Sequence, residues 1–249
     1  MRKLCVINQK GGVGKTTTAV SIAAGLARQD RRVLLVDLDP QGSIAHSLTT
    51  SKQLGLYDLL SGQCSYVDCI DNLGTNLDVI HSTDNLTKIE AQLGKNNKPH
   101  QLISDKFGDV SGYDYIIFDC APSLGLLNQS ALLFSDEAVI PVSTQYLSMT
   151  GLTFMIEAIS ELNEHFGHDL KVSHIVPTMH DIRVRTNRNM LAKLNTDFKS
   201  VVTSPIRINS KLAEAPASGK SIFGYAKSSR GAKDYGLLVE AIMRNEPQT

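Results

Sequence analysis

A glycine-rich stretch near the N-terminus has the residue types and the spacing needed to hold a chain of phosphates. Its residues are Lys10, Gly11, Gly12, Val13, Gly14, Lys15, Thr16 and Thr17. Glycines let backbone N–H groups approach an anion, and the helix predicted to follow adds partial positive charge at its start. Lys15 would be the cation for the terminal phosphates, and the Thr16 hydroxyl is placed to ligate Mg²⁺. The stretch predicts a nucleoside triphosphate as ligand.

The loop departs from the common phosphate-loop pattern at its beginning. That pattern places a glycine where this chain has Gln9, and a second lysine, Lys10, follows. Most lysines are solvated, so Lys10 could be an ordinary surface residue. Because Lys15 already serves the same loop, we expect Lys10 to have a role of its own, such as reaching the nucleotide of another subunit.

Three aspartates follow strands that are predicted to be buried. Asp37 and Asp39 come after residues 31–36, and Asp119 ends the apolar run 115–119. In a parallel sheet, ligands bind beyond the carboxyl ends of the strands, where these side chains would gather. Asp119 would hold a water of the Mg²⁺ shell, or else cap the next turn. If the strand geometry continues past Asp37, alternation would place Asp37 and Asp39 on one side.

Short apolar runs alternate with helical patterns along the chain. Strands are expected at 4–7, 31–37, 77–80, 115–119, 137–142 and 172–177, helices at 18–28, 54–60, 151–165, 188–199 and 231–244, and a surface turn at 94–100. This order predicts the α/β class: a mostly parallel, doubly wound sheet with helices on both faces. We expect one domain that spans residues 1–249, since no linker or repeat interrupts the pattern.

The composition excludes several classes of protein. Of 249 residues, 42% are hydrophobic, and 25 basic residues balance 25 acidic ones. A chain of zero net charge is not a globally basic nucleic-acid binder, so any such binding needs a local patch. No run is long enough for a signal peptide or a membrane span, which predicts a cytoplasmic location. The cysteines, Cys5, Cys64, Cys69 and Cys120, are interpreted as structural thiols.

Four motifs together resemble the ParA/MinD family of ATPases, and the small ParA/Soj type in particular, from residue 4 to about 239. They are the loop with Lys10, the segment 37–42 (Asp-Leu-Asp-Pro-Gln-Gly), the strand that ends at Asp119, and Glu214-Ala215-Pro216. The resemblance implies a deviant P-loop NTPase fold with ATP and Mg²⁺ as cofactors.

The resemblance also assigns roles to individual residues. Lys10 would contact the phosphates bound by the partner subunit, and Asp39 would orient or activate the attacking water. The expected catalytic residues are Lys10, Lys15 and Asp39, and the expected metal site is Thr16, Asp37, Asp39 and Asp119. Asp39 could instead be a turn residue before proline, and Asp37 could be a structural partner of the metal shell without catalytic weight.

Two segments depart from the family pattern. Cys120 to Gly125 resembles the family's switch segment, but Ala121 stands where proline is usual, and we expect no loss of function from this change. Family members often have a proline near the adenine, shortly before Glu-Ala-Pro. Here Pro205 comes two places early and Arg207 stands near the expected position, so the sequence does not identify the adenine contacts.

Basic residues are concentrated in the C-terminal half. Arg183 and Lys211 match family residues that bind DNA without sequence preference, and Arg185, Arg188, Lys220 and Arg230 are weaker candidates. Phosphate contacts need Lys and Arg on a surface but no base code. The alternative for each of them is an ordinary solvated side chain.

The resemblance implies a cycle. In this cycle, ATP drives formation of a homodimer that coats double-stranded nucleoid DNA of any sequence. A ParB-like or other cargo-adaptor protein then stimulates hydrolysis. The cargo that is moved would be a chromosome, a plasmid or a protein body such as a carboxysome. The absence of an N-terminal helix-turn-helix segment argues against the larger plasmid autorepressor type. The alternative is a MinD-like regulator of division-site placement that cycles on membranes, although residues 242–249 lack the amphipathic helix it would need. An iron–sulfur reductase component is disfavoured by the cysteine arrangement.

Overall fold

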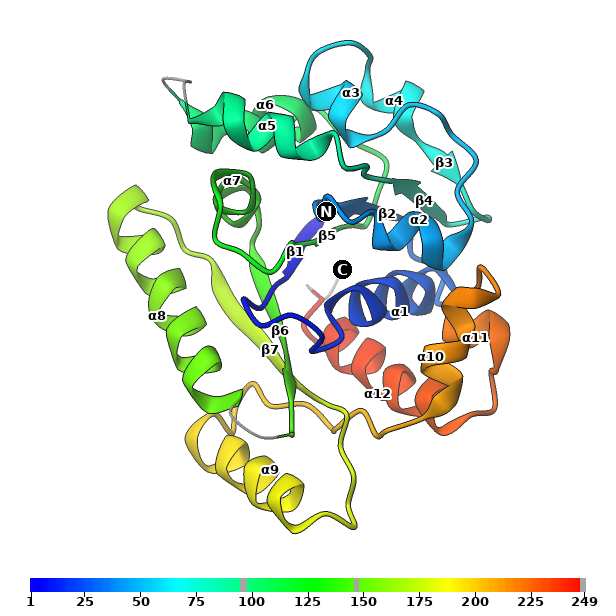
Figure 1. Cartoon of the computed structure of the whole chain (residues 1–249), viewed down its shortest axis with the longest axis vertical. Helices are drawn as coiled ribbons and strands as arrows, with labels where there is room; N and C mark the ends of the chain where they lie inside the picture. The colour runs from blue at the N-terminus through cyan, green and yellow to red at the C-terminus, as the bar shows by residue number, and fades with distance from the viewer. Residues whose placement is uncertain (95–97, 146–147, 247–249) are drawn as a thin grey trace.

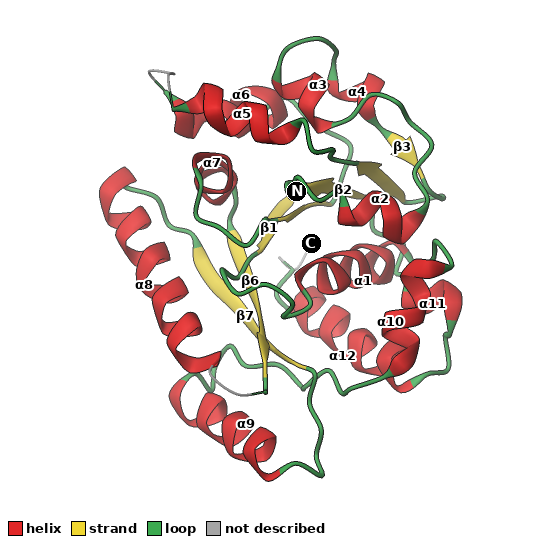
Figure 2. Cartoon of the chain, viewed as in Figure 1, coloured by secondary structure: helices red, strands yellow, loops and turns green. Residues whose placement is uncertain are grey.

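The computed structural model describes residues 1–94, 98–145 and 148–246, and these contain a central seven-stranded sheet (Figures 1 and 2). Its strand order is β3-β4-β2-β5-β1-β6-β7. The strands are β1 (Arg2–Val6), β2 (Val33–Asp37), β3 (Asp71–Asn72), β4 (Leu77–Ile80), β5 (Tyr115–Asp119), β6 (Glu137–Ser143) and β7 (Lys171–Thr178). All neighbours pair in parallel except β3 and β4, so the predicted mostly parallel α/β fold is confirmed.

Helices cover both faces of this sheet. They are α1 (Lys15–Ala27), α2 (Ser43–Leu48), α3 (Leu56–Leu60), α4 (Tyr66–Cys69), α5 (Leu86–Leu93), α6 (Leu102–Phe107), α7 (Leu126–Phe134), α8 (Ser148–Phe166), α9 (Arg185–Asp197), α10 (Ser210–Ala217), α11 (Ile222–Tyr225) and α12 (Arg230–Arg244), with a 3₁₀ turn, η1, at Pro99–Gln101. Figure 1 shows α1 and α12 on one side of the sheet and α7 and α8 on the other.

Side-chain alternation along the strands builds two hydrophobic cores. In β1, Leu4 and Val6 pack with α1 and α12, whereas Cys5 faces the core that contains α7 and α8. Successive side chains of a strand point to opposite faces, so a sheet that is covered on both faces needs continuous apolar strands. This is why short, unbroken apolar runs located the strands correctly.

The expected strands are all present, but several short elements were missed. The sequence analysis did not predict β3, α2, α4, α5, α6, α7, α10 or α11. Most of these span only four to nine residues, which is too short for a clear 3.6-residue period. Of the turn expected at 94–100, residues 95–97 lie outside the described part of the chain, and η1 begins at Pro99. The four cysteines are free, as expected, and the Sγ atoms of Cys64 and Cys69 lie 2.8 Å apart.

Helix α12 returns the chain to the sheet. Its apolar face is buried against α1, and Glu246 beyond its end forms an ion pair with Arg31 at 2.7 Å. A membrane-binding helix would need this face to be available. Within the described residues, no helix combines the length and the apolar character required to cross a bilayer.

Candidate nucleotide site

The glycine-rich loop connects the carboxyl end of β1 to the start of α1, and side chains from other elements hold it in place. Gly14 adopts φ +89°, a left-handed conformation that favours glycine, and precedes the first residue of α1. The buried Asn8 donates to the carbonyl of Pro141 (2.8 Å) and accepts from the N–H of Lys10 (2.9 Å). From β7, the hydroxyl of Thr178 donates to the carbonyl of Val13 (2.8 Å). The loop is therefore anchored at both ends.

The two lysines of the loop occupy different environments. Lys15 is 7% exposed, and its Nζ lies 3.4 Å from the carbonyl oxygen of Lys10. Burial lowers the pKa of Lys15, while the carboxylates of Asp119 and Asp39 oppose this effect. Lys10 is exposed at the molecular surface. The loop thus presents one cation to its own interior and one to a surface that another molecule can approach.

Asp119 and Asp37 are neighbours at the ends of the adjacent strands β5 and β2. Asp119 is fully buried, and neither of its carboxylate oxygens has a hydrogen-bond partner among the described residues. Burial raises the pKa of Asp119, Asp37 raises it further, and the nearby Thr16 hydroxyl and Lys15 ammonium oppose the rise.

This buried, unsatisfied carboxyl group fits a magnesium site. Mg²⁺ keeps several waters and takes few protein ligands, so one carboxylate beside a threonine hydroxyl is a suitable set. Asp119 and Thr16 would hold the ion or its waters. The described residues contain no group of three or more His, Cys, Asp or Glu side chains that could hold a metal ion.

Asp37 differs from the expectation because β2 ends at this residue, so strand alternation does not extend to Asp39. The buried carboxylate of Asp37 instead accepts hydrogen bonds from the backbone N–H groups of Asp39 (3.0 Å) and Ile44 (3.1 Å). Burial raises the pKa of Asp37 to about 7, although these hydrogen bonds favour the charged form. The side chain fastens segment 37–44 to the sheet, and Gly42, at φ +62°, brings the chain close to the carbonyl oxygen of Ser82. These contacts give Asp37 a structural part in this loop, while its part in the metal shell stays a prediction.

Asp39 lies in the turn after β2 and is half-buried. Its Oδ1 accepts the N–H of Gln41 at 3.0 Å. It is close enough to Lys15 to raise the pKa of that lysine. A carboxylate next to the phosphate-binding lysine suits the positioning of a water for attack on a terminal phosphate.

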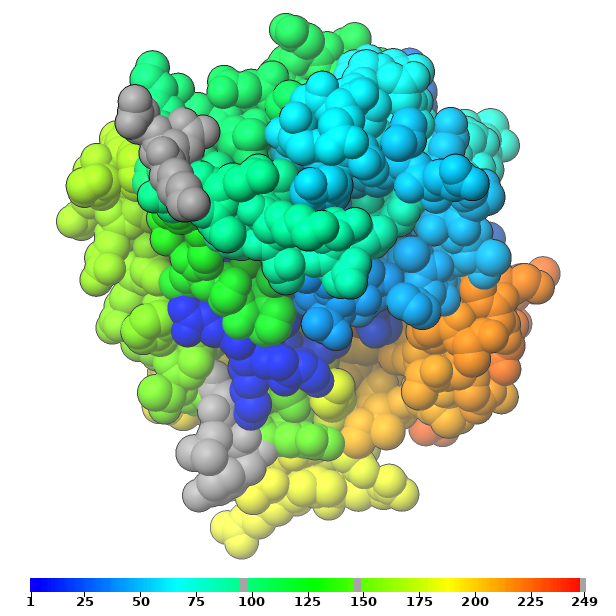
Figure 3. Space-filling view, turned by 45° about the horizontal axis from the view of Figure 1, so that its top comes forward, coloured from blue at the N-terminus to red at the C-terminus, as the bar shows by residue number. Residues whose placement is uncertain are grey.

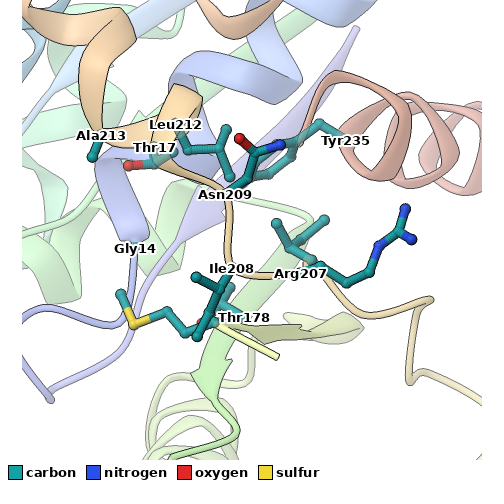
Figure 4. Close-up of a pocket in the computed structure, with 11 residues that line it drawn as sticks. Gly14, Thr17, Thr178, Arg207, Ile208, Asn209, Leu212, Ala213 and Tyr235 are labelled. Carbon is teal, nitrogen blue, oxygen red and sulfur yellow. The ribbon is translucent and has the colours of Figure 1, made fainter. Parts of the chain in front are cut away.

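A cavity of about 220 Å³ opens beside the glycine-rich loop (Figure 4). Gly14 and Thr17 line one side, Met179 follows β7, and Arg207 with Ile208 belongs to the chain that leads to α10. Figure 3 shows the N-terminal loop, the α9 region and the α10 region around a hollow. The cavity has room for a group next to the phosphates, and its lining is mostly apolar.

The six basic residues proposed for DNA binding fall into two groups. Arg183, Arg185 and Arg188 lie at the start of α9, and Lys211, Lys220 and Arg230 lie on or beside α10, α11 and α12. Each of the six is exposed. The sequence analysis treated them as one region, whereas the fold places them on different elements.

The two strongest of these candidates take part in ion pairs within the chain. Arg183 makes two hydrogen bonds to Asp181, at 2.9 and 2.7 Å, and lowers the pKa of that carboxyl to about 2. Lys211 pairs with Glu214 at 2.7 Å. The Arg183 side chain remains 86% exposed. Exposed ion pairs contribute little to stability because water screens the charges, so a phosphate can replace the partner.

Sequence reasoning missed several residues of the site. Asn8 and Thr178 anchor the loop, and Tyr235 on α12 contacts the Thr18 hydroxyl at 3.1 Å. The sequence could have identified Asn8, because a polar residue directly after a buried strand is a candidate site residue. No sequence pattern identifies Thr178 and Tyr235, since they are far from the loop in sequence and only the fold brings them to it.

Comparison with known proteins agrees with this site. The AAA domain family matches residues 1–172. The sporulation initiation inhibitor protein Soj of Bacillus subtilis is 37% identical over 248 residues, covering 97% of this chain and 98% of Soj. The chromosome-partitioning ATPase Soj of Thermus thermophilus is 35% identical, with 98% and 96% covered. The chain belongs to the ParA/Soj family of partition ATPases.

One solved structure bears on the ligands of this ATPase. Cobyrinic acid a,c-diamide synthase from Mycobacterium smegmatis, with a bound ATP analogue and magnesium, is 29% identical with a TM-score of 0.84, covering 98% of this chain and 95% of that one. That protein binds the ATP analogue and magnesium, and this chain has the glycine-rich loop, Lys15, Thr16 and Asp119 as groups suited to such ligands.

Proposed function

We propose that this ATPase, acting as one domain over residues 1–249, forms a homodimer with ATP at the interface. The observation that carries the proposal is that the two lysines of the loop differ in their exposure to solvent. Lys15 is buried against its own loop, whereas Lys10 is exposed beside it. An exposed lysine at the edge of a phosphate site supports contact with the nucleotide of a second copy.

The dimer would bind double-stranded DNA without sequence preference and associate with the nucleoid. The support is the exposure of the six basic residues on a chain of zero net charge. A local patch of this kind contacts phosphates but reads no bases. Two separate groups per subunit would let a dimer contact a duplex at several points.

A partner protein on the cargo, ParB-like or another adaptor, would stimulate hydrolysis and release the dimer from DNA. The cargo would be a chromosome, a plasmid or a protein body such as a carboxysome. The name of the Thermus thermophilus relative, a chromosome-partitioning ATPase, supports chromosome partitioning as the class of task. The membrane-cycling alternative has no support from the described residues, because α12 buries its apolar face on α1.

The base of ATP would occupy the cavity beside Gly14 and Thr17. Its wall of Met179, Ile206 and Ile208 offers apolar contacts to a flat ring. Replacing Ala213, which also lines the cavity, by tryptophan should block it and weaken ATP binding.

The deciding experiment is binding of the purified protein to random-sequence duplex DNA in ATP and in ADP over a series of salt concentrations. Binding that requires ATP and falls steeply with salt is the expected result, since released counterions dominate such complexes. Equal binding in both nucleotides, or none in either, would refute the proposed cycle. Vesicles of anionic lipid, tested in the same way, would reveal membrane cycling.

A further inference from the structure

The cavity wall formed by residues 206–208 is an extended segment that forms an isolated parallel bridge with His180, and one of its N–H groups is directed away from this neighbour. Ile206 donates its N–H to the carbonyl of Pro177 (2.7 Å), and Ile208 donates to that of His180 (3.1 Å). Successive N–H groups of an extended chain point to opposite sides. The N–H of Arg207 therefore faces away from β7, where no strand is available to accept it.

A buried carboxylate on α12 satisfies this group. Asp234, only 4% exposed, accepts the N–H of Arg207 at 3.0 Å, its Nε at 3.0 Å and its Nη2 at 2.5 Å. Figure 4 shows the Arg207 side chain extending away from the part of the wall formed by Ile208 and Leu212. The arginine therefore contributes its backbone to the wall, while its guanidinium is occupied elsewhere.

The next residue of α12, Tyr235, also lines the cavity and contacts the helix that follows the phosphate loop. The Tyr235 hydroxyl contacts the hydroxyl of Thr18 in α1, the helix that starts in the phosphate loop. Consecutive residues of one helix thus connect the wall of the cavity with the helix behind the phosphates. Displacing the wall changes the distance between the surfaces that a base and its phosphates must contact together.

We propose that Asp234 is a positioning residue for ATP: the Arg207–Asp234 pair holds residues 206–208 against the cavity and so sets the affinity for the nucleotide. The inference rests on the proposed placement of the base in this cavity. Asp234 is buried, whereas the Arg207 side chain is 43% exposed, so the group left without a partner when Asp234 is removed is chiefly the backbone N–H of Arg207. Such a loss is larger than when both residues are replaced by groups that need no partner. Proline at position 207 is such a group, because it fixes φ and has no N–H to satisfy.

The test is a double-mutant cycle with two ligands, Mg-ATP and Mg-tripolyphosphate, which has the phosphates but no base. Asp234→Val should weaken ATP binding about tenfold and leave tripolyphosphate binding nearly unchanged. Arg207→Pro combined with Asp234→Val should restore most of the ATP affinity. Asp234→Asn, which keeps the shape of the side chain, should give an intermediate loss even if Asp234→Val folds poorly.

Glu137→Gln provides a matched control. It breaks a similar two-point pair, Arg2 with Glu137, whose atoms approach to 2.7 Å at the other end of the sheet. This variant should lose stability without changing the ratio of ATP to tripolyphosphate affinity.

Two outcomes would overturn the inference while the base remains in the cavity, as shown by weakened ATP binding in Ala213→Trp. One is an equal loss of both ligands in Asp234→Val and Asp234→Asn. The other is a double variant as defective as Asp234→Val. If Ala213→Trp and the Asp234 variants all bind ATP normally, the placement of the base and the inference fall together.

Discussion

Replacing Asp119 by asparagine should have opposite effects on the stability of the folded protein and on its binding of ATP with Mg²⁺. The carboxyl group is fully buried, it lacks a hydrogen-bond partner among the described residues, and Asp37 lies beside it. Asparagine has nearly the same shape but no charge. We expect Asp119→Asn to stabilise the nucleotide-free protein and to weaken its Mg²⁺-dependent binding of ATP, because the same charge that is costly without the ion is useful with it.

The size of the effect follows from the burial. A buried polar group without a partner costs about 1–3 kcal/mol. In a chain of this length, 1 kcal/mol shifts the melting temperature by about 2–4 °C. Because asparagine removes the charge but keeps a polar amide, Asp119→Asn should raise the melting temperature of the nucleotide-free protein by at most about 12 °C at pH 8.

The stabilisation by Asp119→Asn should increase as the pH rises. Burial raises the pKa of Asp119, and that of Asp37 to about 7. A carboxyl whose pKa is raised in the folded state prefers to be protonated there, so its contribution to stability is complete below about pH 4 and is lost as the pH rises through the folded pKa. The difference in melting temperature between wild type and Asp119→Asn should be small near pH 4 and grow toward pH 8.

The assay is thermal unfolding from pH 4 to pH 8, without nucleotide and with Mg-ATP. Ligand at about 100 times its Kd adds about 2.7 kcal/mol to the free energy of unfolding, and the variant should lose most of the part that requires Mg²⁺. Asp84→Asn, at an exposed carboxylate, is the control and should change neither quantity. A lower melting temperature for nucleotide-free Asp119→Asn at pH 8, or an undiminished gain from Mg-ATP, would refute the reasoning.

Three further substitutions test the assigned roles. Lys15→Ala should reduce ATP affinity at least about 100-fold in a direct binding titration, because the phosphates lose their buried cation; unchanged affinity would remove Lys15 from the site. Asp39→Ala should bind ATP normally but release phosphate at least about 100 times more slowly, since the attacking water loses its partner; normal turnover would contradict this role. Arg183→Glu should weaken binding to random duplex DNA about tenfold at moderate salt while ATP-driven dimerisation, measured by light scattering, continues; wild-type DNA affinity would locate the patch elsewhere.

The sequence alone determined the fold class and located the glycine-rich loop and Asp119 at the ends of their strands. The runs that became β1, β2, β5, β6 and β7 are apolar because both faces of a parallel sheet are covered, and this pattern is local. The glycine-rich loop and Asp119 could also be identified from the sequence, since each is a short motif at the end of a strand. Chemistry that is carried by neighbours in sequence can be identified without a structure.

The tertiary structure alone decided how the site is held together. Asp37 was expected to share a strand face with Asp39, but β2 ends at Asp37, and its carboxylate accepts backbone N–H groups from the following loop. The cavity beside the loop is made by β7, the 206–209 segment and α12, and the pair of Arg207 with Asp234 joins residues far apart in sequence. Such contacts depend on where distant elements pack, and packing of this kind leaves no periodic signal in the chain.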